Sequence, residues 1–420
     1  MKKILIIGGG AAGCAAAVFA AERGAQVELF EHNEKLGKKL FITGKGRCNF
    51  TNCCGMEELF DSIVSNPKFL YSAFYGFTNQ QTVEWIESIG VRTKVERGNR
   101  AFPLSDHSSD ITRALERRCR ELGVMIHLNT HVREILTGPG SDPSGRSACG
   151  ILLFDGKKVY GDAVLLATGG LSYKTTGSDG SGHRMAERHG IRVTEMRPAL
   201  VPLETGEQYI SDMQGLSLKN VSLTVRDGKK NRYQGFGEML FTHFGISGPL
   251  VLSASSMIGR YLTDTHPLQG SIDLKPALSE EQLEKRILRE LENGKNKQFR
   301  NILPELVPAK MQPVILKLSG ISGNLKGNEI TKEQRQKIVS VLKKLPFTIT
   351  GQRGYNEAII TQGGIHLKDV DPATMESKKI KGLYFAGEIL DVDGVTGGFN
   401  LQIAWSTAYA AARAMTGEET

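Results

Sequence analysis

The sequence predicts an α/β fold in which a Rossmann-type parallel sheet is assembled from both ends of the chain around an inserted domain. Residues 3–31 have the pattern strand, glycine turn, helix, strand. Two later strands, within residues 163–170 and 382–388, also end in glycine turns. Between them, residues 197–345 change to alternating strands and charged helices. Because open parallel sheets bind ligands at the carboxyl ends of their strands, the three turns are expected to meet at one edge.

The first glycine turn is typical of a dinucleotide-binding site. It reads Gly8-Gly-Gly10-Ala-Ala-Gly13 and lies between a short apolar strand and an alanine-rich helix. Gly8 allows the tight turn, Gly10 lets backbone approach a pyrophosphate, and Gly13 lets the helix pack on the strand. The pyrophosphate would lie at the helix N-terminus, where unpaired N–H groups favour anions. Glu31 ends the next strand and is placed to accept hydrogen bonds from a ribose diol.

The N-terminal segment also resembles a secretory signal or a membrane span, because Met1-Lys-Lys3 precedes an apolar run to Ala21. Three consecutive glycines and the acid-tipped strand argue against a signal, and no other stretch is long and apolar. The six cysteines follow neither a disulfide-framework nor a zinc spacing, which suits a reducing cytosol. We therefore expect a cytoplasmic protein without a membrane span or a metal site.

The chain is basic, with 53 Lys and Arg against 45 Asp and Glu and a formal net charge of +8. Such a charge can indicate a nucleic-acid partner. The basic residues are scattered along the sequence, however, and runs such as Lys343-Lys344 are short, so solvated faces are the favoured explanation. We expect a small-molecule substrate and no nucleic-acid partner, and the sequence leaves the oligomeric state open.

The remaining elements follow from turn signals and helix caps. A basic, glycine-rich loop covers residues 36–52, and Ser279 with Gln282 and Thr331 with Gln334 have capping-box spacing. Helices are predicted around residues 80–89, 108–122 and 397–415, strands at 124–128, 131–136 and 221–225, and a turn-rich hairpin loop at 138–145. The predicted domains are residues 1–196 with 346–420, and an insertion of residues 197–345 that is β-rich over 197–275 and helical over 276–345.

A discontinuous Rossmann domain favours flavin as the resident cofactor. NAD-dependent dehydrogenases usually keep this domain in one piece, whereas FAD proteins commonly use C-terminal residues to complete the cofactor site. Here Gly397-Gly-Phe-Asn-Leu-Gln402 opens the closing helix. Its N–H groups and dipole would face N1 and the C2 carbonyl of a flavin and stabilise the negative charge gained on reduction.

Longer motifs occur throughout the chain, namely Gly44-Lys-Gly-Arg-Cys-Asn-Phe-Thr-Asn52, Leu240-Phe-Thr-His-Phe-Gly-Ile-Ser-Gly-Pro249, Thr361-Gln-Gly-Gly-Ile365, Thr374-Met-Glu-Ser-Lys378 and Gly387-Glu-Ile-Leu-Asp391. With the closing Gly-Gly-Phe-Asn, they make the chain similar to the 3-dehydro-bile-acid Δ4,6-reductase-like flavoproteins. This family also includes enzymes described as aminoacetone oxidases. The resemblance implies non-covalent FAD, a glutathione-reductase-like FAD domain, and an inserted β-barrel-plus-helix domain over the flavin.

The resemblance also implies roles for individual residues. Arg47, Cys48, Thr51 and Asn52 would line the pyrophosphate and the middle of the flavin, and Val132 would meet the adenine through its backbone. With the glycine turns included, the predicted cofactor-binding residues are Gly8, Gly10, Ala12, Gly13, Glu31, Lys39, Gly46, Arg47, Cys48, Thr51, Asn52, Val132, Ala167, Thr168, Gly169, Gly387, Glu388, Asp391, Gly397, Gly398, Phe399, Asn400 and Leu401.

Two cysteines and two histidines are candidates for direct chemistry. Cys48 and Cys53 have the C-x4-C spacing of the redox pair in flavin disulfide reductases. Those enzymes carry a second GxGxxG for NADPH, which this sequence lacks, so a dithiol mechanism is disfavoured. His243 and His366 are candidate catalytic proton donors, because histidine titrates near neutral pH, although each is equally well explained as a structural residue.

These patterns predict an FAD-dependent oxidoreductase that transfers a hydride through flavin N5. Reduction of an activated C=C bond in an enone-type, bile-acid-like or steroid-like substrate is slightly favoured, with NAD(P)H as a transient co-substrate. Oxidation of an aminoacetone-type amine by molecular oxygen is the alternative. A flavin-binding protein that modifies RNA or senses redox state is less favoured.

Overall fold

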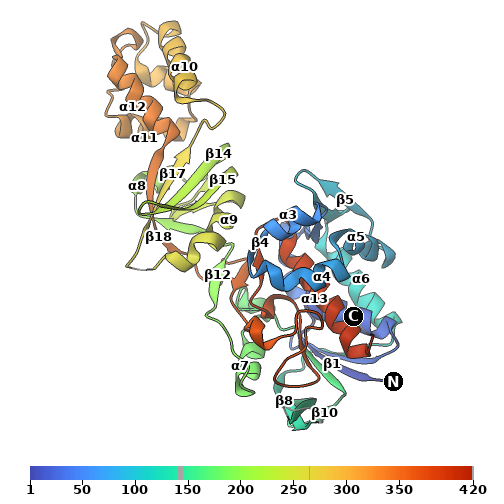
Figure 1. The fold of residues 1–420 in the computed structure, drawn as a ribbon. Coiled ribbons are helices and arrows are strands. Elements are labelled where there is room, and N and C mark those ends of the chain that lie inside the picture. Colours follow the sequence, from blue (N-terminus) through green and yellow to red (C-terminus); the bar gives the residue numbers. More distant parts are fainter. Residues whose placement is uncertain (141–144, 264, 419–420) are drawn as a thin grey trace. The chain divides into compact units, whose positions relative to one another are not determined.

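The computed structural model describes residues 1–140, 145–263 and 265–418 (Figure 1). The chain divides into two compact units, Met1–Pro198 with Tyr355–Thr420, and Ala199–Gly354. The hairpin loop predicted at 138–145 lies partly outside the described residues. No helix among the described residues is long and apolar enough to cross a membrane.

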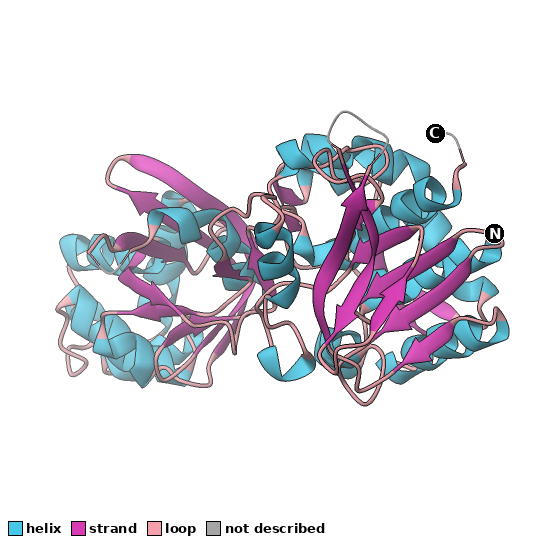
Figure 2. Cartoon of the chain, turned by 90° about the horizontal axis from the view of Figure 1, so that it is seen from below, coloured by secondary structure: helices cyan, strands magenta, loops and turns pink. Residues whose placement is uncertain are grey.

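The first unit is built on a five-stranded parallel sheet with the order β20-β11-β1-β2-β7 (Figure 2). These strands are β20 (Leu383–Phe385), β11 (Ala163–Leu166), β1 (Lys3–Ile7), β2 (Gln26–Phe30) and β7 (Met125–His127). Residues of β11 and β20 are buried throughout, as expected where both faces of a parallel sheet are covered. The predicted discontinuous Rossmann domain is confirmed, because β20 comes from the C-terminal segment.

The C-terminal helix completes this unit by packing along the N-terminal one. Helix α1 (Ala11–Glu22) contacts α13 (Phe399–Thr416), and Phe19 meets Tyr409 edge-on with ring centroids 5.2 Å apart. Alanine at most α1 positions lets the two helices approach closely, and nine residues of α1 are buried. The first and last motifs of the sequence are therefore neighbours in space.

The other elements of this unit form smaller sheets and covering helices. The remaining strands are β3 (Thr51–Asn52), β4 (Ile63–Ser65), β5 (Thr93–Glu96), β6 (Arg100–Pro103), β8 (Val132–Pro139), β9 (Arg146–Leu153), β10 (Lys158–Tyr160), β12 (Arg197–Ala199), β19 (Ile360–Gln362) and β21 (Asp393–Gly394). The remaining helices are α2 (Lys38–Ile42), α3 (Met56–Asp61), α4 (Tyr71–Gly76), α5 (Asn79–Ser88), α6 (Ser108–Glu121) and α7 (Ser181–Arg188).

The second unit is a closed six-stranded barrel with a group of helices inserted between its last two strands in the sequence. The barrel order is β13-β16-β15-β14-β17-β18. Its strands are β13 (Leu203–Thr205), β14 (Ser217–Asp227), β15 (Lys230–Phe241), β16 (Gly245–Ser247), β17 (Leu268–Asp273) and β18 (Leu345–Gln352). Its helices are α8 (Gln208–Asp212), α9 (Pro249–Ile258), α10 (Glu280–Asn293), α11 (Gln312–Ser319) and α12 (Lys332–Lys343). Both predicted capping boxes, at the starts of α10 and α12, are formed.

The predicted domain boundary at residue 346 differs from the structure. Strand β18 belongs to the inserted unit, because it pairs with both β17 and β13 and so closes the barrel. Its inward residues Leu345, Phe347 and Ile349 belong to the barrel core. The return to the first unit therefore comes at Tyr355.

Candidate cofactor site

The first glycine turn is held by contacts that only glycine permits. Gly8 has φ +103°, and a Cβ on Gly13 would lie 1.8 Å from the Gly8 carbonyl oxygen. A Cβ on Gly10, by contrast, would meet no atom within 4 Å, and φ there is −80°. Helix α1, which Gly10 precedes, has no side-chain cap. The turn therefore leaves an open cradle at an uncapped helix N-terminus, the arrangement that favours an anionic ligand.

Glu31, which follows the end of β2, holds this turn through hydrogen bonds. Its Oε2 accepts a hydrogen bond from the Gly9 N–H at 2.7 Å, and its Oε1 accepts from the backbone and side-chain N–H groups of Asn33 at 2.8 and 2.6 Å. The residue is buried, with 8% of its surface exposed. A carboxylate offers about four lone-pair sites, so capacity remains for a ribose diol.

Replacing Glu31 with alanine should weaken FAD binding by roughly 10- to 100-fold, because a hydrogen bond to a charged group contributes about 1.5–3 kcal/mol. FAD titration of the deflavinated protein measures this affinity. Glu34→Ala is the matched control, since Glu34 is an exposed acid of the same loop that pairs with Lys38. Equal FAD affinity in wild type and Glu31→Ala would remove Glu31 from the ribose site.

The loop of residues 44–52 and the start of α13 are joined by side-chain hydrogen bonds. The Thr51 hydroxyl donates to Gln402 Oε1 at 2.5 Å, and the Asn52 amide donates to the Gly397 carbonyl at 3.1 Å. The Trp405 indole donates to the Phe50 carbonyl at 2.9 Å. The structure thus brings the predicted residues Thr51, Asn52, Gly397 and Gly398 together, with Phe399, Asn400 and Leu401 in the first turn of α13.

A second junction joins the loop after β2 to the two later glycine turns. Lys39 Nζ lies 2.6 Å from Glu388 Oε2, and Glu388 Oε1 accepts from the Thr361 N–H at 2.8 Å. A Cβ on Gly169 would lie 3.8 Å from Glu388 Oε2, so the ends of β11 and β20 are adjacent. A Cβ on Gly387 would lie 2.8 Å from the Ala12 methyl. The predicted convergence of three glycine-ended strands is therefore observed.

The other predicted residues take varied positions. Ala167 and Thr168 directly follow β11. Val132 is half-buried and is the first residue of β8. Two residues earlier, the Thr130 N–H donates to the Glu31 carbonyl, so the start of β8 lies near the end of β2. A Cβ on Gly46 would meet no atom within 4 Å. Asp391 lies beside Asn66, which donates to its carbonyl at 2.7 Å, and burial raises the pKa of its carboxyl.

Arg47 is occupied by protein partners. Its guanidinium pairs with Glu96 and Asp106 and lies over the Phe102 ring, 4.2 Å from the centroid. A pyrophosphate contact through this side chain would require it to exchange these carboxylates. No sequence pattern indicates this pairing, because Glu96 and Asp106 lie 49 and 59 residues further along the chain.

The cysteines and histidines have structural surroundings. Cys48 and Cys53 are free thiols, and burial raises the pKa of Cys48 to about 12, opposite to the shift that a reactive thiolate needs. His366 Nδ1 accepts from the Lys368 N–H at 3.2 Å, which caps a short 3₁₀ helix. His243 lies in the inserted unit, is exposed, and packs edge-on against Phe244. A proton-donor role for either histidine stays a prediction.

Comparison with known proteins identifies the family. The profile of the HI0933-like protein Rossmann domain matches residues 2–414. The chain belongs to the HI0933-like family. A 3-dehydro-bile acid delta(4,6)-reductase of Clostridium scindens is 33% identical over 420 residues, 99% of each chain. A ribosomal RNA dihydrouridine synthase of Haemophilus influenzae is 32% identical over 410 residues, 97% of each chain.

The fold is also similar to a solved steroid enzyme. The crystal structure of 3-ketosteroid-delta4-(5alpha)-dehydrogenase from Rhodococcus jostii RHA1 matches with a TM-score of 0.53 at 14% identity, over 98% of this chain and 97% of that chain. Family and fold together make this HI0933-like chain an FAD-dependent oxidoreductase.

The residues present fit FAD. Two helix N-termini, those of α1 and α13, have no side-chain cap, and the backbone at Gly10 and Gly46 is open. Among the described residues, two buried polar atoms near these turns, Thr168 Oγ1 and Asn49 Oδ1, have no hydrogen-bond partner. Buried polar groups normally find a partner, so these atoms are suited to a polar cofactor.

One acidic residue of this HI0933-like site escaped the sequence analysis. Asp393, in β21, is 1% exposed, and Gln362 donates to both of its carboxylate oxygens at 3.2–3.3 Å. Burial raises the pKa of Asp393 to about 6. The only available signal was its place two residues after Asp391, which does not predict burial.

Replacing Asp393 with asparagine should stabilise the protein at pH 7.5 and leave its stability at pH 4 nearly unchanged. The folded-state pKa lies above the unfolded value, so the wild type loses stability as pH rises from about 4 to about 6. A two-unit shift corresponds to roughly 2–3 kcal/mol. Urea unfolding at both pH values measures it, with exposed Asp61→Asn as control. Equal pH dependence in Asp393→Asn and wild type would contradict the assignment.

Proposed function

We propose that this HI0933-like protein uses FAD to reduce a C=C bond conjugated with a carbonyl group, with NAD(P)H as the electron donor. The observation that carries the proposal is the shared chemistry of two full-length relatives with different substrates. A delta(4,6)-reductase of a 3-dehydro bile acid saturates a bond conjugated with the C3 carbonyl. A dihydrouridine synthase saturates the C5=C6 bond of uracil, which is conjugated with the C4 carbonyl.

The reaction balances with one hydride from NAD(P)H and one proton from solvent. NAD(P)H supplies the hydride, the β-carbon of the conjugated bond receives it, the α-carbon receives a proton, and NAD(P)⁺ is released. Bound FAD would supply hydride transfer through its N5 atom. The Gly8–Gly13 turn and Glu31 would hold its adenosine diphosphate part. Thr51, Asn52 and the uncapped start of α13 would hold its redox end, where the helix dipole favours negative charge.

Two substrate classes are consistent with this chemistry. A small enone of steroid type agrees with the bile acid reductase relative. Uracil within ribosomal RNA agrees with the Haemophilus influenzae relative at nearly the same identity. Both substrates contain an α,β-unsaturated carbonyl group, so the same assay can test each of them. The substrate that reoxidises the flavin separates the two classes.

The experiment is an anaerobic two-step reaction followed by flavin absorbance. NADH or NADPH should first bleach the flavin, and a 3-oxo-4,6-diene steroid or purified ribosomal RNA should then restore the colour. Mass spectrometry identifies the saturated product, a gain of two hydrogens. Bleaching by aminoacetone instead, with recovery only in oxygen, would contradict the proposal and favour an amine oxidase.

A further inference from the structure

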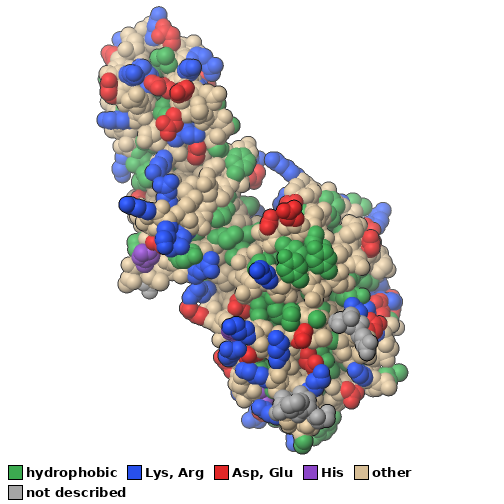
Figure 3. Space-filling view, viewed as in Figure 1, with side chains coloured by type: hydrophobic (Ala, Val, Ile, Leu, Met, Phe, Trp, Pro, Cys, Tyr) green, Lys and Arg blue, Asp and Glu red, His purple; other side chains and the backbone are tan. Residues whose placement is uncertain are grey.

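The positive charge of the chain is concentrated in one part of the inserted unit. Residues 275–345, defined here as the helical lobe, contain 15 Lys and Arg and 8 Asp and Glu. The lobe therefore carries +7 of the chain's net charge of +8, and the other residues together carry +1. On the visible face of the lobe, Lys and Arg side chains are interspersed with acidic ones (Figure 3). The basic residues are scattered along the chain as expected, but their excess over acids lies in the lobe.

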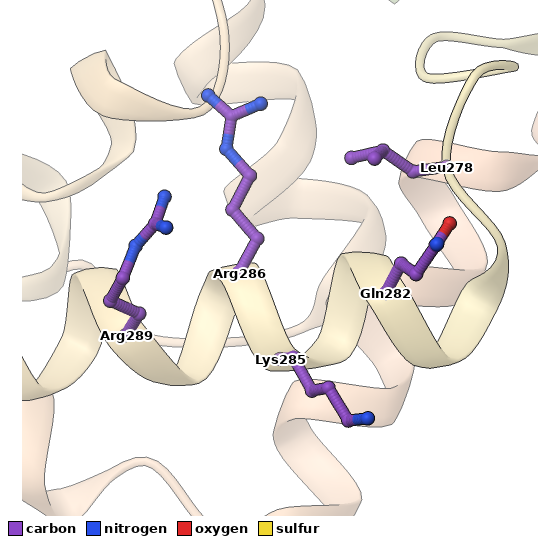
Figure 4. Close-up of a pocket in the computed structure, with 5 residues that line it drawn as sticks. All are labelled: Leu278, Gln282, Lys285, Arg286 and Arg289. Carbon is purple, nitrogen blue, oxygen red and sulfur yellow. The ribbon is translucent and has the colours of Figure 1, made fainter.

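Helix α10 presents part of this charge as an open pocket. The pocket is lined by Leu278, Gln282, Lys285, Arg286 and Arg289 (Figure 4). The last four side chains have the three- and four-residue spacing that places them along one helix face. The opposite stripe, with Leu283, Ile287 and Leu291, is buried in the lobe core. The basic face is therefore held rigidly outward by packing on the other side.

The cations of this face are incompletely paired. Arg286 donates to the Glu305 carbonyl at 3.2 Å, but its buried Nε has no hydrogen-bond partner among the described residues. Burial and the nearby Arg286 charge lower the pKa of Lys275. Arg289 pairs with Glu290 at 3.1 Å, and 67% of the Arg289 side chain remains exposed. An anionic ligand on this face would relieve the repulsion between Lys275 and Arg286.

We propose that the helical lobe is a docking surface for the phosphate backbone of folded RNA, with the α10 face at its centre. Arginine forks match phosphate geometry, and several cations on one open face fit a polyanion better than a single small anion. The only aromatic residue of the lobe, Phe299, is fully buried, so contacts with phosphates are favoured over stacking on bases. Leu288 is the only exposed large hydrophobic residue of the lobe, which disfavours insertion into a membrane.

This inference goes beyond the proposed reductase activity, because it concerns binding by a surface outside the predicted cofactor site. The test uses the holoenzyme and a fluorescein-labelled RNA duplex of about 24 base pairs, with fluorescence anisotropy as the readout. Wild type should bind, and its affinity should fall steeply with salt concentration. Lys285→Glu with Arg289→Glu should weaken binding at least tenfold and reduce the salt slope by about 1–2.

The matched control is Lys157→Glu with Lys158→Glu, which makes the same change in charge on exposed residues of the first unit. It should change RNA affinity less than threefold. Equal weakening by both pairs, or no binding by wild type, would overturn the proposal. Binding of wild type to anionic phosphatidylserine vesicles but not to RNA would assign the lobe to a membrane instead. Flavin bleaching by NAD(P)H should be unchanged in both variants, so failure of the reductase proposal is seen separately.

Discussion

Replacing Gly10 with alanine should abolish FAD binding while leaving the fold of the FAD-free protein intact. The backbone at Gly10 already has a φ that alanine adopts, and the added Cβ would meet no protein atom within 4 Å. An alanine at this position should therefore leave the FAD-free fold unstrained, and its effect on FAD would come from the space that the added methyl takes from the pyrophosphate. We expect FAD content after purification to fall at least tenfold, with the melting temperature of the deflavinated protein within about a degree of wild type.

Gly13→Ala is the contrasting variant, with an expected loss of the fold itself. Its Cβ would lie 1.8 Å from the Gly8 carbonyl oxygen, so α1 would have to move off β1. No side-chain rotation relieves a contact between Cβ and backbone. We therefore expect the free energy of unfolding to fall by about 3 kcal/mol or more, the upper end of the range for overpacked sites.

Urea unfolding and FAD titration separate the two glycine variants. Gly10→Ala should lose affinity without losing stability, and Gly13→Ala should lose both. A Gly10→Ala protein that binds FAD like wild type would show that the pyrophosphate lies elsewhere. A stable Gly13→Ala protein would mean that the helix and strand are less closely packed than described.

The parts of the fold set by local pattern were predictable from the sequence. The glycine turns after β1, β11 and β20 were found because short apolar strands and glycines mark them directly. Both capping boxes were found because their spacing is fixed by helix geometry. The barrel boundary was missed because membership of β18 depends on its pairing with β13 and β17, and strand pairing has no local signature.

The geometry of the candidate site was predictable only where a residue's position follows from the backbone. Glycines at turns and Glu31 at a strand end belong to this class. Arg47, however, is held by Glu96 and Asp106, and Asp393 owes its raised pKa to burial, which are tertiary effects. The charge of the helical lobe was overlooked for a different reason. Its cations occur singly or in pairs, and their excess over acids is evident only when the charges are summed over residues 275–345.

Replacing Gly398 with alanine should displace the start of α13 and lower the flavin midpoint potential. Gly398 has φ +100°, and a Cβ there would lie 2.4 Å from the Thr51 carbonyl oxygen and 2.5 Å from its carbon. The first conflict of this Cβ is therefore with the Thr51 backbone and not with the cofactor. Helix and loop must therefore separate, and both carry predicted FAD contacts.

The strain of a positive φ must be distinguished from this clash. Gly123→Ala is the matched control, since Gly123 has φ +74° and a Cβ there would meet no atom within 4 Å. Both variants carry the left-handed backbone cost of about 1–2 kcal/mol, but only Gly398→Ala has the clash. We expect FAD occupancy to fall at least tenfold in Gly398→Ala and to stay near wild type in Gly123→Ala.

The potential of the FAD-loaded Gly398→Ala fraction tests the orientation of α13. If the helix N-terminus faces the redox end, its withdrawal removes more stabilisation from the negatively charged reduced flavin than from the neutral oxidised form. A differential loss of about 1.4 kcal/mol lowers a two-electron potential by about 30 mV. Spectroelectrochemical titration measures the shift. An unchanged potential together with reduced occupancy would mean that α13 holds the cofactor without facing its redox end, because a helix dipole acts only over its first turn.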